Sequence, residues 1–341
     1  MGTIDADAHV VETERTWEYS EANEKQYMPV NVEVKKPDGS FEDFWLIDGR
    51  LHARRRNIGH NTTTGTREMS DVDARLKHMD ELGVDIHVLY PSIFLRPLTD
   101  KPAAEIALHR SYNRWMADIW SHAKGRLRWA AMIPYISPDA AIKEMRWAKD
   151  NGACAIFARG IEADRRMTDP YFFPIYDAAC ELDLPLGIHS SGSTLDMYEW
   201  WADEAGFNRF KLTVVGCFHS MVAGDLSRQF PRLRAGFIEV SAQWVPYVIH
   251  DLRKRLEVRG RSLGENVLKE HNLWVACQTD DDLPYVLKYA GEDNLIIGSD
   301  YGHNDTSTEL EALRNLKQSG QVEERVVNKI LDDNARAFYG F

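Results

Sequence analysis

Short apolar runs, rich in β-branched residues, recur along the chain and leave room for a helix between most of them. The eight clearest runs cover residues 3–10, 84–92, 127–135, 153–160, 184–191, 234–242, 272–280 and 294–302. Near-continuous apolar runs of this length are typical of strands that are buried on both faces of a parallel sheet. We therefore predict eight parallel strands.

Several segments between these runs have the period of an amphipathic helix. The clearest is 70–83, in which apolar side chains recur every three or four positions. Its Ser70 and Asp73 resemble a capping box, and Gly83 is a typical stop signal. Similar helical patterns cover residues 102–125, 137–152 and 169–183.

The alternation of strands and helices predicts the fold class. Eight such units favour an α/β fold, the closed (β/α)₈ TIM barrel, which uses a chain of this length as one domain. A doubly wound open sheet is the alternative, but it normally has a glycine-rich phosphate-binding turn after its first strand. Here the first strand ends in DAHVVE. We predict a single TIM-barrel domain over residues 1–341.

Residues 13–69 do not fit the alternation and form a predicted insertion after the first strand. The segment is rich in polar and aromatic residues, and NVEVKKPDGSFEDFWLIDG is typical of a hairpin that turns at PDGS. We interpret the insertion as a lid above the barrel that carries Trp17, Trp45 and three arginines. A solvated decoration or an oligomer contact is the alternative.

Charge and composition exclude some partners. Of the 341 residues, 44% are hydrophobic, which is enough for one large core. The formal net charge of −12 argues against a nucleic-acid surface, because binding phosphates needs clustered lysines and arginines. Arg54, Arg55 and Arg56 form the only dense basic cluster, and it is too small for that purpose.

The cysteines and the length of the apolar runs indicate a compartment. Cys154, Cys180, Cys217 and Cys277 are widely spaced, which indicates neither a disulfide framework nor a thiolate zinc site, but buried free thiols in a reducing compartment. The N-terminus has no signal-peptide pattern, and no run approaches the roughly 20 apolar residues of a membrane span. We expect a soluble cytoplasmic protein without a membrane partner.

Polar side chains stand at the ends of the predicted strands, where a TIM barrel places its chemistry. Asp7 and His9 are two residues apart, so both point to one face of the first strand. The other polar residues in such positions are Arg159, His189, Glu239, Asp300 and, three residues further on, His303.

The carboxylates and imidazoles of this set predict a metal site. Zinc, manganese and iron accept both ligand types, whereas soft copper prefers thiolates. Each residue also has an ordinary alternative, because His189 could be a core histidine and Asp300 a helix cap. Independent strands would not place so many metal-binding groups at one end by chance, so we favour the metal site.

These motifs resemble those of the amidohydrolase superfamily, in the branch that contains aminocarboxymuconate-semialdehyde decarboxylase and the γ-resorcylate and 5-carboxyvanillate decarboxylases. The resemblance runs nearly end to end. DADAHVVE stands where the family has HxH, ExH or DxH, LPLGIHSS matches the strand-five histidine, SRQFPRLRAGFIE the FPxLK approach to strand six, and LIIGSDYGH the strand-eight aspartate. The resemblance implies that Asp7, His9, His189 and Asp300 hold a divalent metal.

One position departs from the pattern of these decarboxylases, which place a proton-transferring histidine in a GHxGE-like segment at the end of strand six. The resemblance aligns Glu239 with that histidine. Glu239, His219 and His303 would then complete a second metal site, or Glu239 would be a general base while the two histidines orient substrate or water. We expect one or possibly two divalent ions, zinc, iron or manganese, per chain.

Two reactions fit such a centre. We predict hydrolysis of an amide, ester, thioester or lactone by metal-bound hydroxide, because the metal lowers the pKa of its water to ~7. By the resemblance, Asp300 would pass the proton of the water to the leaving group, and Glu239 or His219 could share that role. The alternative is metal-dependent, non-oxidative decarboxylation of a hydroxybenzoate-like acid, in which protonated Asp300 or His219 would protonate the ring carbon.

The predicted substrate is a small, ring-containing carboxylated metabolite. Arg159 and the cluster around Arg55 could hold its acid group through forked hydrogen bonds, and Trp200 and Trp201 could form a flat apolar wall. Solvated arginines and packed tryptophans are the ordinary alternative. A homodimer is expected because closed symmetry is common among soluble enzymes. A metal-free binding protein is disfavoured, since none of the four expected ligands is missing.

Overall fold

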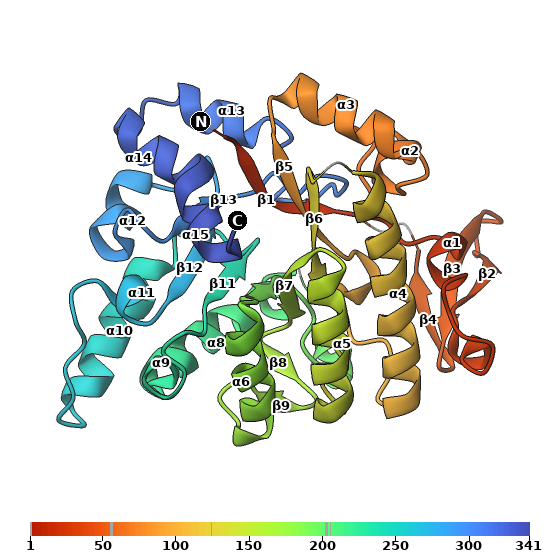
Figure 1. Ribbon diagram of the computed structural model, residues 1–341, viewed down its shortest axis with the longest axis horizontal. Coiled ribbons are helices and arrows are strands. Elements are labelled where there is room, and N and C mark those ends of the chain that lie inside the picture. Colours follow the sequence, from red (N-terminus) through yellow and green to blue (C-terminus); the bar gives the residue numbers. More distant parts are fainter. Residues whose placement is uncertain (1, 55–56, 124, 202–203, 205) are drawn as a thin grey trace.

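Eight parallel strands surrounded by helices form the body of the molecule (Figure 1). The structure is a computed structural model that describes residues 2–54, 57–123, 125–201, 204 and 206–341. In hydrogen-bonded order, the strands are β1 (Ile4–His9), β5 (Ile86–Tyr90), β6 (Leu127–Ala131), β7 (Ala153–Ala158), β10 (Leu186–His189), β11 (Ala235–Ile238), β12 (Leu273–Cys277) and β13 (Leu295–Ile297).

The sheet closes between its first and last strands. The Asp300 amide donates to the Asp7 carbonyl at 2.9 Å, and the His9 amide donates to the Tyr301 carbonyl at 2.8 Å. These bonds join the C-terminal end of β1 to the segment that follows β13. The predicted (β/α)₈ TIM barrel is therefore confirmed, with each of the eight predicted strands present but shorter than its apolar run.

Helices that pack outside the barrel bury one apolar stripe each, as predicted for the four clearest segments. Those four are α3 (Val72–Leu82), α4 (Pro102–His122), α5 (Pro138–Asp150) and α6 (Phe173–Leu182). The capping box at Ser70 is wrong by one residue, because the side chain of Asp71 caps α3 by accepting from the Ala74 amide at 2.8 Å. Gly83 ends α3 in the left-handed conformation at φ 73°, as expected.

The remaining described helices are shorter on average and connect the later strands. They are α8 (Leu212–Ala223), α10 (Val245–Glu257), α12 (Leu283–Ala290), α13 (Ala312–Gln318), α15 (Asn334–Tyr339) and the short α1 (Glu14–Trp17), α2 (Thr64–Arg67), α7 (Leu195–Trp200), α9 (Leu226–Gln229), α11 (Val267–Glu270) and α14 (Glu324–Asn328). Single turns are η1 (Lys25–Tyr27), η2 (Ile93–Leu95), η3 (Pro170–Phe172), η4 (Phe207–Lys211) and η5 (Lys329–Asp333), and β8 (Ile161–Glu162) pairs with β9 (Arg165–Arg166).

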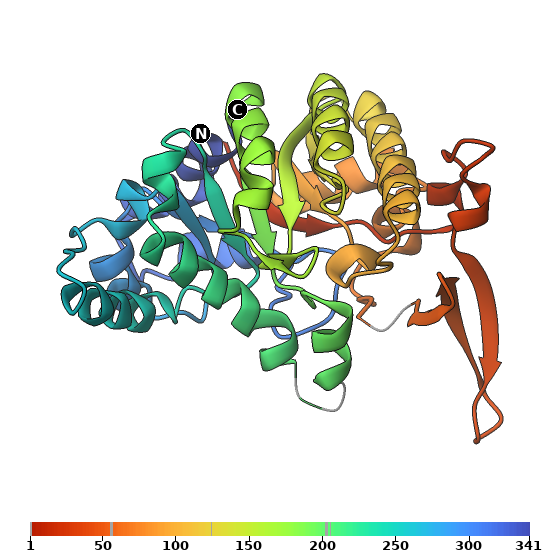
Figure 2. The same ribbon diagram turned by 90° about the horizontal axis from the view of Figure 1, so that it is seen from below.

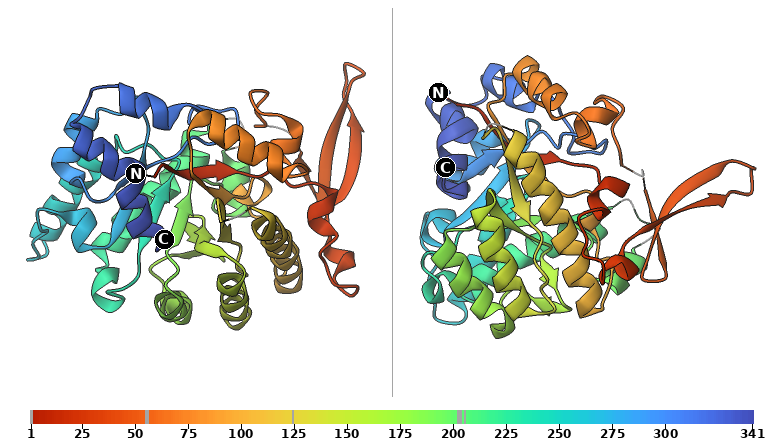
Figure 3. Two further views of the ribbon diagram at one scale, coloured as in Figure 1. Left: turned by 45° about the horizontal axis from the view of Figure 1, so that its top comes forward. Right: turned by 45° about the vertical axis from the view of Figure 1, so that its right-hand side comes forward.

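The predicted insertion, residues 13–69, contains a three-stranded antiparallel sheet of β2 (Val30–Lys35), β3 (Phe41–Ile47) and β4 (Arg50–Ala53). Its hairpin turns at PDGS as predicted, closed by a 2.8 Å bond from the Lys36 amide to the Ser40 carbonyl. Figures 2 and 3 show β2 and β3 extending away from the barrel. The base of the insertion is anchored by Trp17 and Trp45, which are buried in edge-to-face contact.

Two smaller expectations concern the cysteines and membrane spans. All four cysteines are free thiols, as predicted, and three are buried whereas Cys180 is half-buried. Among the residues that the structure describes, no helix has the length and apolar character needed to cross a membrane.

Candidate metal centre

Six acid and imidazole side chains converge at the C-terminal end of the barrel, and we call them the carboxylate–imidazole cluster. Asp7 and His9 come from the end of β1 and His189 from the end of β10, while the others lie just beyond β11 and β13. The six are Asp7, His9, His189, Glu239, Asp300 and His303, each no more than 9% exposed. The side chains meet because parallel strands of a barrel all end at the same rim.

The atoms at the centre of the cluster are close enough to share a cation. His9 Nε2 lies 3.3 Å from Asp7 Oδ1, 3.3 Å from Asp300 Oδ1 and 3.8 Å from Glu239 Oε2. His189 Nε2 lies 3.1 Å from Asp7 Oδ1. Two groups of four donors have their ligand atoms within 4.8 Å of one another, and both groups contain His9 and Glu239.

Hydrogen bonds on the far side of two imidazole rings fix which nitrogen faces the cluster. His9 Nδ1 lies 3.0 Å from the Pro91 carbonyl and His189 Nδ1 lies 2.9 Å from the Ser190 carbonyl. A carbonyl only accepts, so each Nδ1 carries a proton, and when the ring is neutral its Nε2 presents a lone pair to the carboxylates. Lone pairs facing carboxylate oxygens are the arrangement that a metal ion requires.

Several of these buried atoms have no hydrogen-bond partner among the described residues. They are His9 Nε2, Glu239 Oε2, Asp300 Oδ1 and His303 Nδ1. Buried polar atoms are normally paired, because leaving one unpaired costs about 1–3 kcal/mol. His9 Nε2, Glu239 Oε2 and Asp300 Oδ1, gathered in one buried cluster, fit a divalent cation with nitrogen and oxygen ligands.

The protonation of the cluster shows how strongly the carboxylates need compensation. Burial, followed by repulsion from Asp300 and other carboxylates, holds the pKa of Glu239 well above its usual range. Burial also raises the pKa of Asp300 to about 6, although nearby His303 opposes that shift. A cation would reverse both effects, because it favours the ionised form of each carboxylate.

His303 forms a proton-holding pair with Asp300. Its Nδ1 lies 2.8 Å from Asp300 Oδ1, and its Nε2 lies 2.8 Å from Ser92 Oγ. Because the Ser92 hydroxyl donates to the Val10 carbonyl at 2.7 Å, His303 Nε2 must be the donor toward Ser92. Burial opposes protonation of His303, but the Asp300 carboxylate outweighs it and the pKa of His303 is raised.

Glu239 and Asp300 hold strained backbone conformations. Their φ angles are 60° and 52°, in the left-handed region that non-glycine residues rarely adopt. Such strain costs on the order of 1–3 kcal/mol per residue and concentrates at functional sites. Here the turns at the ends of β11 and β13 aim both carboxylates at the cluster.

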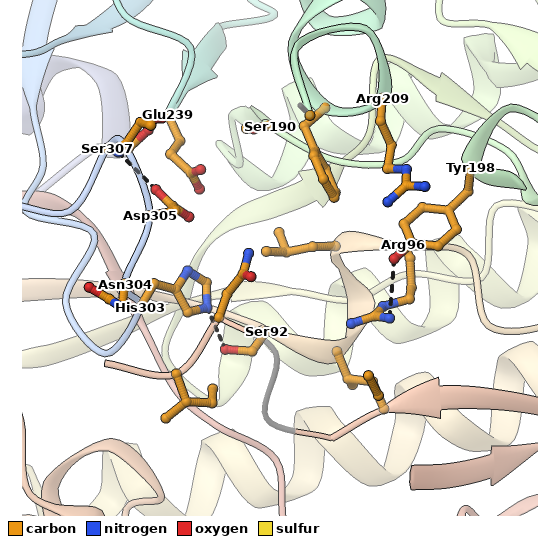
Figure 4. Close-up of a pocket in the computed structure, with 18 of the residues that line it drawn as sticks. Ser92, Arg96, Ser190, Tyr198, Arg209, Glu239, His303, Asn304, Asp305 and Ser307 are labelled. Atoms are coloured by element: carbon orange, nitrogen blue, oxygen red, sulfur yellow. Dashed lines mark hydrogen bonds between the residues drawn. The ribbon is translucent and has the colours of Figure 1, made fainter. Parts of the chain in front are cut away.

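A cavity of about 710 Å³ opens above the cluster. Glu239 and His303 line it on one side, and loop residues line the opposite side (Figure 4). Among the described residues, four cationic residues line the cavity. One is Arg54 of the insertion, and the other three, Arg96, Arg209 and Lys211, we call the cationic wall. Arg96 follows η2, and the other two lie in the π-helical turn η4.

His219 is one predicted site residue that the structure does not bring to the cluster. It lies on α8, in the helical layer, where its Nε2 is 3.2 Å from Asp251 Oδ2 of α10. The buried face of α8 carries neighbouring apolar side chains such as Phe218 instead. The prediction for His219 is therefore wrong, because helical periodicity places it toward α10 rather than into the barrel.

The predicted substrate contacts are also placed elsewhere. Arg159 is buried and paired with Glu162 Oε2 at 2.6 Å, and it does not line the cavity. Trp200 and Trp201 are 74% and 37% exposed and are likewise absent from the cavity lining. Arg55 lies outside the described residues, whereas its neighbour Arg54 does line the cavity.

The residues that sequence reasoning missed come from the segments that connect β5 with α4 and β10 with α8. Arg96, Tyr198, Arg209 and Lys211 line the cavity, but none stands at a strand end. The segment EAGFNRFK alternates aromatic and cationic residues, which is the one signal that could have indicated a wall. Without the chain path from β10 to α8, that signal cannot be assigned to the cavity.

Comparison with known proteins gives a family and a fold. The sequence model of the family described as Amidohydrolase matches residues 4–341. A solved amidohydrolase from Mycobacterium avium subsp. paratuberculosis K-10 is 20% identical with a TM-score of 0.80, and the match covers 99% of both chains.

Two similar structures are 5-carboxyvanillate decarboxylases. The enzyme from Sphingomonas paucimobilis is 16% identical, with a TM-score of 0.72 and coverage of 100% of this chain and 99% of the other. The enzyme from Novosphingobium aromaticivorans is 18% identical, with a TM-score of 0.70 and coverage of 100% and 97%. The latter structure contains manganese and 3-methoxy-4-hydroxy-5-nitrobenzoic acid.

Proposed function

The chain belongs to the amidohydrolase family, and from this premise we propose that it is a metal-dependent decarboxylase of a hydroxylated aromatic acid. Sequence analysis favoured hydrolysis and kept decarboxylation as the alternative. The resemblance to 5-carboxyvanillate decarboxylases now favours that alternative. The observation that carries the proposal is the Asp300–His303 pair, which supplies a proton source even though Glu239 replaces the expected strand-six histidine.

Asp7, His9, His189 and Asp300 are the proposed ligands of one cation. A single cation is favoured because both four-donor groups need His9, whose Nε2 has only one lone pair to give. Manganese is the preferred candidate because the N. aromaticivorans enzyme binds it, while zinc and iron suit the same donors. When bound, the cation would neutralise the carboxylates and hold the carboxylate and neighbouring hydroxyl of the substrate.

Asp300 is the proposed acid. When the bond between the ring carbon and the carboxyl group breaks, carbon dioxide leaves and the electron pair stays on the ring carbon. That carbon then takes a proton that Asp300 receives from His303. The His303 imidazolium, hydrogen-bonded to Ser92 and 2.8 Å from Asp300, is positioned to restore that proton.

Glu239 favours hydrolysis as the second candidate. Its carboxylate lines the cavity beside the cluster, where it could accept a proton from a water molecule that attacks a carbonyl group. A second cation bound at Glu239 is expected only if the protein is a binuclear hydrolase.

Product analysis separates the two reactions. Manganese-loaded protein is incubated with a panel of hydroxybenzoates and, separately, with a panel of esters, thioesters and lactones. We expect carbon dioxide from at least one ortho-hydroxylated acid and no acid release from the second panel. Acid release without carbon dioxide would support hydrolysis and contradict the proposal.

The insertion carries two further proposals, a lid and a dimer contact. Trp45 and Arg54 line the cavity, which supports the lid. Val30, Leu46 and Leu51 are paired neighbours across β2, β3 and β4, and all three are exposed, which supports a contact with a second copy of the chain. Light scattering would test the dimer, and Leu46→Asp should yield a monomer. Cytoplasmic location also stays a prediction.

A further inference from the structure

Arg209 is a buried cation without a counter-ion. Its side chain belongs to a residue only 6% exposed, and no ion pair involving it is found among the described residues. Its Nε has no hydrogen-bond partner, and its guanidinium lies over the ring of Tyr198 at 4.4 Å. The face of an aromatic ring attracts the positive charge, but it does not accept hydrogen bonds from the N–H groups as strongly as a carboxylate does. A buried charge is costly unless it is paired, so this arrangement favours an anion beside Arg209.

Arg96 approaches the same tyrosine from another loop. It donates to the Tyr198 hydroxyl at 3.3 Å, and its guanidinium lies 5.6 Å from the ring centre. Figure 4 shows the two guanidinium groups on either side of Tyr198, directed into the cavity. Two planar guanidinium groups on either side of the Tyr198 ring form a site that can bind an oxyanion through several charge-assisted hydrogen bonds.

Two members of the cationic wall, Arg96 and Arg209, lie across the cavity from the carboxylates. In Figure 4, Glu239, His303 and Asp305 lie on one side, whereas Arg96, Tyr198 and Arg209 lie on the other. The cavity thus has an acidic end, where a cation would sit, and an end with two guanidinium groups, where the Glu204 carboxylate accepts from the Arg209 amide at 3.1 Å. A ligand that satisfies both must carry two acidic groups, one at each end.

The size of the cavity supports a longer ligand than a single-ring acid. Its 710 Å³ falls within the range of about 300–1,000 Å³ that holds drug-sized molecules. Phe207 and Phe210 of η4 line the cavity next to the cationic wall and provide apolar surface for the body of such a ligand.

We propose that Arg209 and Arg96, arranged around Tyr198, form an anion-binding subsite for a second acidic group of the substrate. This inference rests on the proposed function for the metal-binding end of the substrate. The substrate class is then an aromatic diacid in which a carboxylate or phosphate stands remote from the acid group that the cation holds.

Calorimetric titration of the manganese-loaded full chain tests the subsite without needing turnover. The probes are naphthalene-2,6-dicarboxylate and biphenyl-4,4′-dicarboxylate, each compared with its mono-acid, and a phosphonate version of each diacid. We expect at least one diacid to bind about tenfold more tightly than its mono-acid. The phosphonate arm shows whether the subsite prefers a planar or a tetrahedral anion.

Three variants locate the effect. Arg209→Gln should remove the tenfold advantage of the diacid and leave the mono-acid within about twofold, and Arg96→Gln should reduce the advantage in the same direction. Arg228→Gln, an exposed arginine on α9, is the matched control and should change neither affinity. Melting curves establish that each variant is folded. If Arg209→Gln does not fold, the Arg96→Gln variant tests the subsite in its place.

The outcomes separate this subsite from the proposed reaction. Equal affinities for diacid and mono-acid, no binding of any diacid, or an equal loss of both affinities in Arg209→Gln would overturn the subsite. A diacid preference that depends on Arg209 in a protein that releases no carbon dioxide would keep the subsite and overturn the decarboxylase. Carbon dioxide release without a diacid preference would do the reverse.

Discussion

The two ends of the cavity are built in different ways. The carboxylate–imidazole cluster comes from the ends of β1 and β10 and from the residues just after β11 and β13, so the closed barrel fixes it. The cationic wall comes from the segments after η2 and before α8, which hydrogen bonds within loops hold in place. The contrast assigns chemistry to the strand ends and substrate choice to the loops, as the TIM-barrel fold allows.

The largest expected effect is at the cluster. Asp300→Asn should lower the decarboxylation rate about 10²- to 10⁴-fold, because the amide cannot donate a carboxylic proton to the ring carbon. Turnover is measured as carbon dioxide release, together with the affinity for the tightest-binding diacid. Exposed Asp333→Asn is the control. Because we assign the chemistry to the cluster and substrate selectivity to the cationic wall, we expect Asp300→Asn to keep the preference for diacid over mono-acid. A variant that loses this preference but keeps its turnover would contradict that assignment.

A buried carboxylate outside the cavity sharpens the comparison by its response to pH. Burial raises the pKa of Glu105 to about 8 from an ordinary 4.5, and the Ile136 amide donates to its carboxylate at 3.0 Å. The unfolded chain loses this proton near pH 4.5 and the folded chain only near pH 8, so the group costs stability progressively as pH rises between these values.

Glu105→Gln should therefore raise the free energy of unfolding by roughly 3 kcal/mol at pH 7, and by much less at pH 4. Urea titrations at both pH values measure it, with exposed Glu257→Gln as the control. An equal gain in the free energy of unfolding at the two pH values would show that the gain does not come from the titration of Glu105. Metal loading should not alter the gain, because Glu105 is not part of the cluster.

Removal of the metal by a chelator should lower the stability of the protein through the cluster, independently of Glu105. Removing a cation present at 100 times its dissociation constant costs about 2.7 kcal/mol, which lowers the melting temperature by roughly 4 °C in a domain of this size. His189→Ala lacks a proposed ligand, and its melting temperature should barely respond to chelator. A chelator shift of equal size in His189→Ala would argue against the assigned ligands.

The smallest expected effect concerns the hydrogen bond behind the proton pair. Ser92→Ala removes the partner of His303 Nε2 and should lower turnover about tenfold, the low end of the effect of losing an outer partner at a metal site. Ser220→Ala on α8 is the control. Unchanged turnover, with a pH profile identical to that of the unmodified protein, would remove His303 from the proposed proton path.

The sequence was most informative where the backbone alone dictates position. The two-residue spacing of Asp7 and His9 and the strand-end positions of His189, Glu239 and Asp300 were sufficient to predict that these side chains meet. Whether they bind a metal stays a prediction. These side chains meet because all strands of a parallel barrel end at the same rim.

The errors arose where position depends on contacts that the sequence does not encode locally. His219 is near the site in sequence motifs, but a helical face directs it to Asp251. Arg159 stands at a strand end, yet Glu162 three residues later neutralises it. Arg209 was missed because its place at the cavity depends on the path of a long loop.

Anomalous scattering from crystals grown with manganese would locate the metal directly. We expect one manganese ion per chain, within about 2.3 Å of Nε2 of His9 and His189 and of a carboxylate oxygen of Asp7 and Asp300. Manganese elsewhere, a second full-occupancy ion at Glu239, or an empty cluster under saturating manganese would contradict this expectation.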